Sequence, residues 1–214
     1  MTNINKLLLI GLLFPLSAWG QDNKSETAGS RDKYSKYIKQ LEGGDLNIDY
    51  TDFRNSFLDS EQFGRKRTNY YTLKQKVRSE INNSNYQEVI KLTKDLLDLD
   101  YTSMSAHSYL HHAYGMIGDT ANQKKHQNIE LGLIYSIIKS GDGKTCETGW
   151  HVTQIEEEYY ILNIIGAQLQ IQSISNSGKN ACDKMIVKTS EGKTETYYFE
   201  ANKVFEMEKK LFEQ

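Results

Sequence analysis

Two histidines, His107 and His111, have the spacing of metal ligands. They lie four residues apart in a segment with helical periodicity, so both imidazoles share one helix face. The zinc-protease form of this pair has a glutamate directly after the first histidine, and Ser108 stands there. The local pattern supplies no third ligand, and only folding would bring His112 or His126 near. We keep the pair as a candidate binding site and predict no metal or other cofactor.

A loop at residues 140–145 (Ser-Gly-Asp-Gly-Lys-Thr) ends in the Gly-Lys-Thr of a phosphate-binding loop. That motif requires a glycine five positions before Gly143, where Ile138 stands, and a strand before the loop, where we predict a helix. Two alternatives remain: a glycine cap that ends the helix, or a functional loop at the junction of two halves of the protein. Asp142 is the candidate binding residue of this loop.

Asp49, Asp52 and Arg54 form a polar cluster within about one helical turn. In a binding site, the guanidinium of Arg54 would orient a carboxylate through charge-assisted hydrogen bonds. Aspartates also hydrogen-bond to nearby backbone in caps and turns, and such a network would fix the start of the helix that carries Phe53. We favour the capping network and keep the three residues as candidate binding residues.

The run of glutamates at 156–158 is the densest group of carboxylates in the chain. Two carboxylates can share acid–base work, but we predict a strand here, and consecutive strand residues point to opposite faces. We therefore interpret the run as solvated. His151 lies close to Cys146 and would activate a thiolate, unless Cys146 is bridged. Asp142 and His151 are the remaining candidates for a catalytic role.

The first twenty residues predict export. Lys6 is the only charged side chain among them, residues 7–16 are apolar, and Ala18 and Gly20 are small residues before a cleavage point at Gln21. The apolar run is about half the length that a membrane-spanning helix needs. We expect residues 1–20 to be a signal peptide and the mature protein to reside in the periplasm or to be secreted, without a transmembrane segment.

Cys146 and Cys182 are the two cysteines of the chain. In an oxidising compartment, an even pair indicates a disulfide, whereas the alternative is two separate thiols, one in a loop and one at the start of a strand. The bond forms only if the fold brings the two Cα atoms within about 7 Å.

The charge balance excludes a strongly basic nucleic-acid-binding surface. The chain has 26 basic and 28 acidic side chains, for a net charge of −2, whereas nucleic-acid binding leaves a marked basic excess. We expect the partner to be another protein or a peptide.

The apolar spacing divides the chain into a helical part and a strand-like part. Residues 31–139 have helical periodicity, and residues 147–199 have the periodicity of strands. The expected helix caps are Ser30, Thr51, a capping box at 84–87, Thr102 or Ser103, and Thr120. The last of these helices should turn Leu131, Ile134 and Ile138 toward the core.

The strand-like part predicts a small antiparallel meander. The expected strands are 157–165, 169–174, 185–187 and 197–199, with a hairpin turn at 190–193 and a further strand around Trp150 and Val152. Residues 202–212 predict a short amphipathic helix. The fold class is therefore α+β, with helices covering one face of the sheet.

Residues 86–121 resemble a tetratricopeptide repeat unit. The motifs are Asn-Tyr-x-Glu-Val-Ile from residue 85, Leu-Leu-x-Leu-Asp from residue 96, Ala113-Tyr114 and Gly118-Asp119. The proline usual near the loop is replaced by Tyr101-Thr102, and only about one and a half units are present where a solenoid needs about three. The helices therefore require support, which we expect from the sheet.

The mature chain as a whole resembles an exported bacterial family, domain of unknown function 4919. The motifs are Gly44-Asp45-Leu46, residues 49–54, residues 140–145, residues 157–159 and Cys182-Asp183. The resemblance implies a helical half followed by a small sheet, and it implies no activity. The expected organisation is a flexible segment at 21–30, a helical part at 31–140 and a sheet part at 141–214, packed as one unit.

Two functions fit these observations. The first is a non-enzymatic protein-binding module of the cell envelope, because repeat-like helical pairs bind peptides and no catalytic signature is present in the sequence. The second is a hydrolase or metal-dependent enzyme with its site between helices and sheet, using Asp142, His151 and either His107 or Asp49. Convergence of those side chains in one cleft would favour the enzyme.

Overall fold

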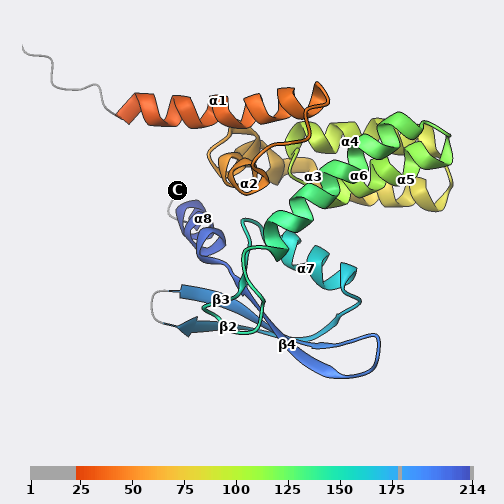
Figure 1. The fold of residues 1–214 in the computed structure, drawn as a ribbon. Helices are drawn as coiled ribbons and strands as arrows, with labels where there is room; N and C mark the ends of the chain where they lie inside the picture. Colours follow the sequence, from red (N-terminus) through yellow and green to blue (C-terminus); the bar gives the residue numbers. More distant parts are fainter. Residues whose placement is uncertain (1–22, 178–179, 213–214) are drawn as a thin grey trace, which may run out of the picture.

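The computed structural model describes residues 23–177 and 180–212 of the chain. The predicted signal peptide at 1–20 lies outside the described residues. Figure 1 shows a helical part that extends into an arm, with a sheet below it and one helix, α7, between them. The described helices include none that is both long enough and apolar enough to cross a membrane.

Six helices form the first part of the protein, as the periodicity predicts. They are α1 (Asn23–Glu42), α2 (Tyr50–Leu58), α3 (Glu61–Asn82), α4 (Tyr86–Leu99), α5 (Met104–Met116) and α6 (Thr120–Ile138). α3 packs against α4, α4 against α5 and α5 against α6, so the four make up the arm, and α1 lies across α2 (Figure 1). Gly44, with a φ of +88°, follows the end of α1 in the left-handed conformation that glycine adopts without strain.

Carboxylates and serines begin these helices, although two predicted caps lie one or two residues too late. Ser103 caps α5 as predicted, because its side chain accepts a hydrogen bond from the backbone N–H of Ala106. The cap of α2 is Asp49 instead of Thr51, and the cap of α6 is Asp119 instead of Thr120. In both helices the aspartate carboxylate accepts a hydrogen bond from a backbone N–H of the first turn.

Two further cap predictions were wrong. The capping box at 84–87 does not form: Ser84 has a φ of +56°, and Asn85 precedes α4 without a side-chain capping bond. The amide of Asn85 donates to Glu80 of the preceding helix instead. The first helix already begins at Asn23, so Ser30 lies inside it and does not precede it.

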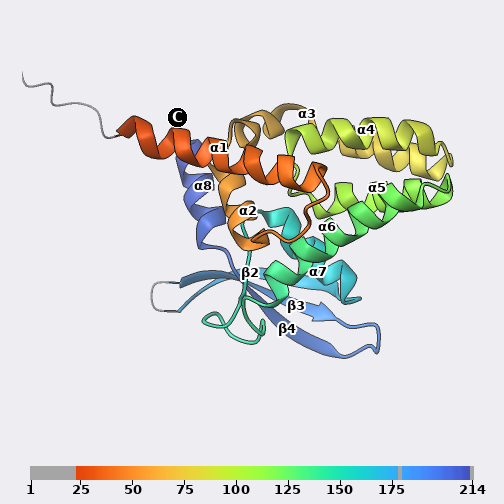
Figure 2. The same cartoon turned by 45° about the horizontal axis from the view of Figure 1, so that its top comes forward.

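The sheet has four strands in the order β1-β4-β3-β2. They are β1 (Trp150–His151), β2 (Gln168–Ser177), β3 (Asn180–Lys188) and β4 (Thr194–Glu200). The meander of β2, β3 and β4 is antiparallel, as predicted, and β1 joins β4 in parallel, so the sheet is mixed. The tail forms α8 (Asn202–Phe212), which rises from the end of β4 toward α1 and α2 (Figure 2).

The predicted strand at 157–165 was wrong, because this segment is a helix, α7 (Ile155–Ile164). Three glutamates occupy its first turn, where acidic side chains are favoured by the helix dipole. Ile161 and Leu162 are buried, as are two of the glutamates. The sequence pattern of so short an apolar run does not distinguish a half-buried helix from a strand. Here the acidic first turn favours the helix.

One hydrophobic core runs through both parts of the protein. It joins helix residues such as Phe53 and Leu133 to sheet residues such as Met185 and Phe199. The buried face of α6 differs from the prediction, since it consists of Ile129, Leu133 and Ile137 together with His126. Leu131 is exposed, and Ile134 and Ile138 are only partly buried. The inward face of α6 is therefore rotated from the expected one.

The predicted disulfide between Cys146 and Cys182 is confirmed. The two Cα atoms lie 5.7 Å apart, and both cysteines are buried. The bond connects the loop after α6 to β3, so it ties the chain between the two parts of the protein to the middle of the sheet. A bridged Cys146 has no thiolate for His151 to activate.

Candidate binding site at the junction of helices and sheet

The predicted cluster of Asp49, Asp52 and Arg54 is divided between two environments. Asp49 caps α2, and its carboxylate accepts from the N–H of Asp52. Asp52 faces α1, where it receives hydrogen bonds from Lys33 and Tyr37. Arg54 turns the opposite way and is fully buried. The capping interpretation therefore describes Asp49, whereas Asp52 joins α2 to α1 and the partner of Arg54 lies elsewhere.

Arg54 binds the start of α7. Its Nη1 donates to Oε2 of Glu157 at 2.9 Å, and its Nη2 donates to the carbonyl oxygen of His151 at 3.1 Å. Glu157 also accepts from the backbone N–H of Thr153 at 2.7 Å and from its hydroxyl at 3.1 Å. Glu157 is thus a buried ion-pair partner and not a solvated charge. The pair fastens α2 to the segment that leads from the sheet into α7.

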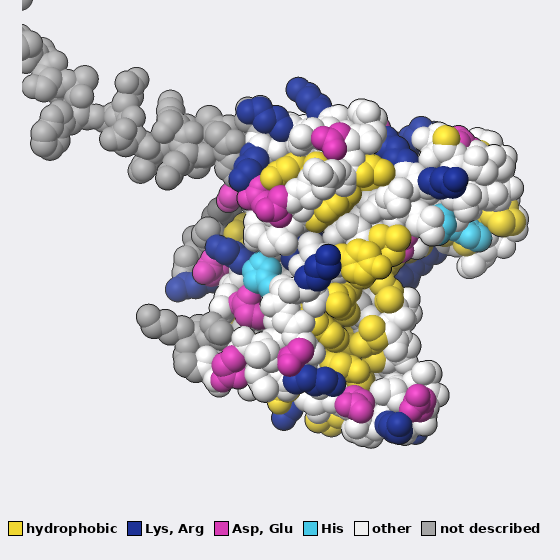
Figure 3. Space-filling model, viewed as in Figure 1, with side chains coloured by type: hydrophobic (Ala, Val, Ile, Leu, Met, Phe, Trp, Pro, Cys, Tyr) yellow, Lys and Arg dark blue, Asp and Glu magenta, His cyan; other side chains and the backbone are white. Residues whose placement is uncertain are grey.

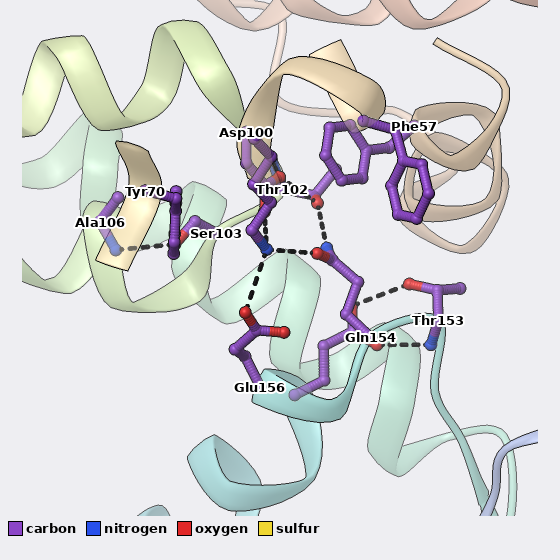
Figure 4. Close-up of polar contacts among 12 residues, drawn as sticks. Phe57, Tyr70, Asp100, Thr102, Ser103, Ala106, Thr153, Gln154 and Glu156 are labelled. Atoms are coloured by element: carbon purple, nitrogen blue, oxygen red, sulfur yellow. Dashed lines mark hydrogen bonds and ion pairs between the residues drawn. The ribbon is translucent and has the colours of Figure 1, made fainter. Parts of the chain in front are cut away.

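A second buried network centres on Lys66 of α3, and Figure 4 shows its labelled partners from the loop after α4 and from the start of α7. The Nζ of Lys66 lies 3.0 Å from Asp100 Oδ2, 2.5 Å from Gln154 Oε1 and 3.4 Å from Glu156 Oε1. Three acceptors therefore surround the three protons of the ammonium group. Gln154 donates in turn to the hydroxyl of Thr102 at 3.0 Å.

The charge of Lys66 is stabilised by its surroundings. Burial alone would lower the pKa of this amine, but the carboxylates of Asp100 and Glu156 outweigh burial and raise the pKa above its ordinary value. Asp100 is held in turn by the backbone N–H and the hydroxyl of Thr102, at 2.9 and 2.6 Å. Lys66 is therefore a permanently charged structural group at neutral pH.

An apolar cleft of about 390 Å³ opens beside Lys66, between α3, α7 and α8. Its lining residues are Phe63, Lys66, Tyr71, Thr153, Gln154, Ile155, Glu156, Tyr159, Val204 and Met207. Three of the apolar side chains are substantially exposed: Tyr71 at 61%, Tyr159 at 45% and Ile155 at 38%. The buried polar network forms one wall of this cleft, and the apolar side chains form the rest.

The predicted histidine pair does not converge. The buried ring of His107 contacts His126, with 3.0 Å between the two Nδ1 atoms, and its Nε2 lies 2.9 Å from the carbonyl oxygen of Tyr101. His111 faces Glu130 on the surface, at 3.6 Å. Over residues 23–177 and 180–212, no three histidine, cysteine, aspartate or glutamate side chains gather in a metal-binding arrangement.

The tautomers of the buried pair follow from its partners. A carbonyl oxygen can only accept, so Nε2 of His107 must carry a proton and donate to Tyr101. The Nδ1 of a neutral His107 is then an acceptor, and Nδ1 of His126 donates to it. Both rings are neutral in this arrangement. Burial lowers the pKa of His107 to about 4. Burial, and after it the charge that a protonated His107 would carry, lowers the pKa of His126 to about 3.

Acid should therefore destabilise the protein well before most carboxylates titrate. In the unfolded chain both histidines take up protons near their ordinary pKa of 6.5, whereas the folded protein resists protonation until about pH 4. Stability is full above pH 6.5 and falls as the pH drops toward 4, by up to about 1.4 kcal/mol per histidine per pH unit. Urea unfolding at pH 7 and pH 5 measures this loss.

The substitution His126→Gln should remove about half of that pH dependence. The matched substitution is His112→Gln, because His112 is exposed, and it should leave the dependence unchanged. Equal stability of the wild-type protein at pH 7 and pH 5 would contradict the assignment.

The loop at 140–145 is held largely by hydrogen bonds to Thr148. The N–H groups of Asp142 and Gly143 both donate to the carbonyl oxygen of Thr148, at 3.0 and 2.9 Å, and are not directed at a ligand. The carboxylate of Asp142 accepts from the hydroxyl of Thr148 and the N–H of Lys144. Lys139 caps α6, so the glycine cap was also wrong. The loop is also joined to the sheet, because Gly143 accepts at its carbonyl oxygen from the N–H of Tyr198 at 2.9 Å and Ser140 accepts at its hydroxyl from the N–H of His151 at 2.8 Å.

His151 lies apart from Asp142 in its interactions. Its Nε2 is 3.5 Å from Oε2 of Glu200, and its backbone carbonyl receives Arg54. Burial lowers the pKa of His151, and Glu200 opposes that effect. Asp142, His151, His107 and Asp49 thus have four different sets of partners.

Sequence reasoning missed Lys66, Asp100 and Gln154. Asp100 begins an Asp-Tyr-Thr-Ser stretch that is typical of a turn with side-chain capping, so it was detectable as a structural residue. Lys66 and Gln154 carry no such signal, because Lys66 and its partner Gln154 are 88 positions apart in sequence.

The fold defines an α+β protein with a helical arm, a four-stranded mixed sheet and a partly apolar cleft between α3, α7 and α8. The chain belongs to the family described as Domain of unknown function (DUF4919), whose model matches residues 23–210. The resemblance inferred from the sequence motifs is therefore confirmed. No curated protein and no solved structure matches the chain.

Proposed function

We propose that this protein is an exported, non-enzymatic module of the cell envelope that binds another protein or a peptide in the apolar cleft between α3, α7 and α8. The observation that carries the proposal is the cleft itself, about 390 Å³ in volume with Tyr71, Ile155 and Tyr159 exposed at it. Exposed apolar groups gathered around one hollow are typical of binding surfaces, and aromatic side chains dominate the affinity of such surfaces.

The polar wall of the cleft favours binding over catalysis. A lysine that acts as a base or nucleophile needs a lowered pKa, and the pKa of Lys66 is raised by Asp100 and Glu156. These groups hold the cleft in shape. They also offer polar partners at its edge, since Glu156 accepts from the hydroxyl of Tyr71 at 2.9 Å.

The alternative, a hydrolase or metal-dependent enzyme at the helix–sheet junction, has weaker support. Its candidates serve separate structures: Asp142 a turn, His151 a contact with Glu200, His107 a buried hydrogen bond with His126, and Asp49 a helix cap. A single hydrolytic site would require some of them to share hydrogen bonds.

Export is supported by the disulfide. Buried bridges such as Cys146–Cys182 persist in the periplasm and outside the cell, and they are rare in the cytosol. We expect the mature protein to begin at Gln21, which sequencing the amino terminus of protein from a cell fractionation would test. A mature chain that retains residues 1–20 in the cytoplasm would overturn the proposed location.

Substituting Ile155→Asp should abolish capture of the partner. The aspartate places a charge in the apolar cleft, and at the first position of α7 it is compatible with the helix dipole, so folding should be preserved. The measurement is a pull-down from envelope extract with the purified mature protein. We expect the partner bound by the wild-type protein to fall about tenfold or more, the effect typical of a hot-spot residue.

The matched control is Ile117→Asp at the end of α5, away from the cleft. Ile117 is 40% exposed and Ile155 is 38% exposed, so both variants introduce the same charge at isoleucines of similar exposure, although the helix dipole favours it at α7 and opposes it at α5. The control should capture the partner as the wild-type protein does. Equal capture by all three proteins would show that binding does not use the cleft and would overturn the proposal.

A further inference from the structure

A second pocket, of about 580 Å³, adjoins the apolar cleft on the other side of Glu156 and Tyr159, which line both. It lies between α3, α5 and α7. Its other lining residues are polar or cationic, apart from the rings of two tyrosines: Lys74, Arg78, Ser105, Ser108, Tyr109, Tyr160 and Asn163. The apolar cleft therefore continues into a pocket of different chemistry.

Two cations face this pocket without a counter-ion. Lys74 and Arg78 lie four residues apart on α3, so they occupy one face of the helix and repel each other. The Nε of Arg78 donates to the hydroxyl of Tyr109 at 3.1 Å, which is a neutral partner. In the part of the chain that the structure describes, no carboxylate lies within ion-pair distance of either cation, whereas Lys66, two turns earlier, has two.

We propose that Lys74 and Arg78 form a carboxylate-binding subsite, which receives an acidic group that the partner carries next to the apolar group held in the cleft. The subsite rests on the proposed function, because it names the chemistry of the segment that binds there. The planar guanidinium of Arg78 keeps donors available after its bond to Tyr109, and such donors match a carboxylate.

The charge of the pocket favours one negative charge over two. Two cations, Lys74 and Arg78, and one carboxylate, Glu156, give a net charge of +1 on the lining. A carboxylate group neutralises that charge, whereas a phosphate dianion would leave an excess negative charge beside Glu156. Ser105 and Ser108 of α5 add hydroxyl donors on the opposite wall.

The ionisation of Lys74 agrees with an anion-binding site. Burial lowers the pKa of Lys74, Glu156 partly opposes this, and the charge of Arg78 lowers it further. A bound carboxylate would raise that pKa again, so binding and protonation of Lys74 support each other.

Binding of two matched probes tests the subsite. The probes are 2-naphthylacetate and 2-naphthylacetamide, which share an aromatic body and differ in charge. We expect calorimetry or NMR titration of the disulfide-bonded mature protein to show the acetate binding about tenfold more tightly, with the advantage lost at high salt. Lys74→Met should lower the affinity for 2-naphthylacetate to that for 2-naphthylacetamide. Lys76→Met, an exposed lysine on the same helix, should have no effect.

The outcomes separate the subsite from the cleft. Equal binding of both probes to the wild-type protein would overturn the subsite and leave the cleft intact. If Ile155→Asp weakens neither probe, or neither probe binds at all, the cleft fails together with the subsite. A third probe, 2-naphthyl phosphate, should bind no better than the acetate, and tighter binding of the phosphate would overturn the assignment to a carboxylate.

Discussion

Replacing Arg54 with methionine should destabilise the protein by about 3 to 5 kcal/mol, as expected when one member of a buried ion pair is removed. The side chain of Arg54 is fully buried, and that of Glu157 is nearly so. Methionine fills much of the space but leaves the Glu157 carboxylate facing an apolar group in place of its cation. Only the two hydrogen bonds from Thr153 would remain to hold that carboxylate.

The measurement is urea unfolding followed by circular dichroism at neutral pH. The double substitution Arg54→Met with Glu157→Gln should recover part of the loss, because it removes the uncompensated charge. The matched surface pair is Lys193 and Glu191. The Nζ of Lys193 lies 2.7 Å from Oε2 of Glu191, and both side chains are largely exposed. Lys193→Met should change stability by less than about 1 kcal/mol. A loss at Arg54 no larger than that at Lys193 would contradict the buried pair.

The helix that carries Arg54 was predictable from the sequence, but the burial of Arg54 was not. Phe53 and Phe57 recur at helical spacing, so the helix and its buried face were predictable. The arginine between them has the same local context as a solvated one. Its burial depends on Glu157, which is 103 positions away, and no local pattern records that distance.

The error at α7 has the same origin. Three glutamates followed by tyrosines and isoleucines fit a strand with a charged start as well as they fit a helix. The structure buries two of these carboxylates, those of Glu157 and Glu158, and Glu157 meets Arg54, whereas the partly exposed Glu156 meets Lys66. Burying a carboxylate costs free energy unless a cation accompanies it. The cations that pair with this segment come from α2 and α3, so its burial could not be predicted from the local sequence.

The site was missed because a surface is a property of several elements together. Ile155 and Tyr159 come from α7, Tyr71 from α3, and Val204 and Met207 from α8. On the face that Figure 3 shows, hydrophobic side chains also gather between the arm and the sheet, with both signs of charge around them. The near balance of charge was predictable from composition, but the clustering of apolar side chains from different helices was not.

Removing the disulfide should destabilise the protein by about 3 to 4 kcal/mol, the loop-closure value for a bridge between residues 36 positions apart. The double substitution Cys146→Ser with Cys182→Ser makes this change without leaving a free thiol. Both positions are buried, so the serine hydroxyls should add a further penalty. The measurement is the urea unfolding midpoint of the wild-type and double-variant proteins, each with and without reductant.

Reductant should lower the midpoint of the wild-type protein and leave the double variant unchanged. The effect should be largest near the bridge, because Cys146 anchors the loop that leads into β1, and β1 leads through Thr153 and Gln154 into α7. Hydrogen exchange should therefore rise first in that segment and later in α4 and α5. Since the same segment forms the wall of the apolar cleft, reduction should also weaken partner binding. Unchanged exchange in residues 146–155 after reduction would show that the Lys66 and Arg54 networks alone hold α7 in place.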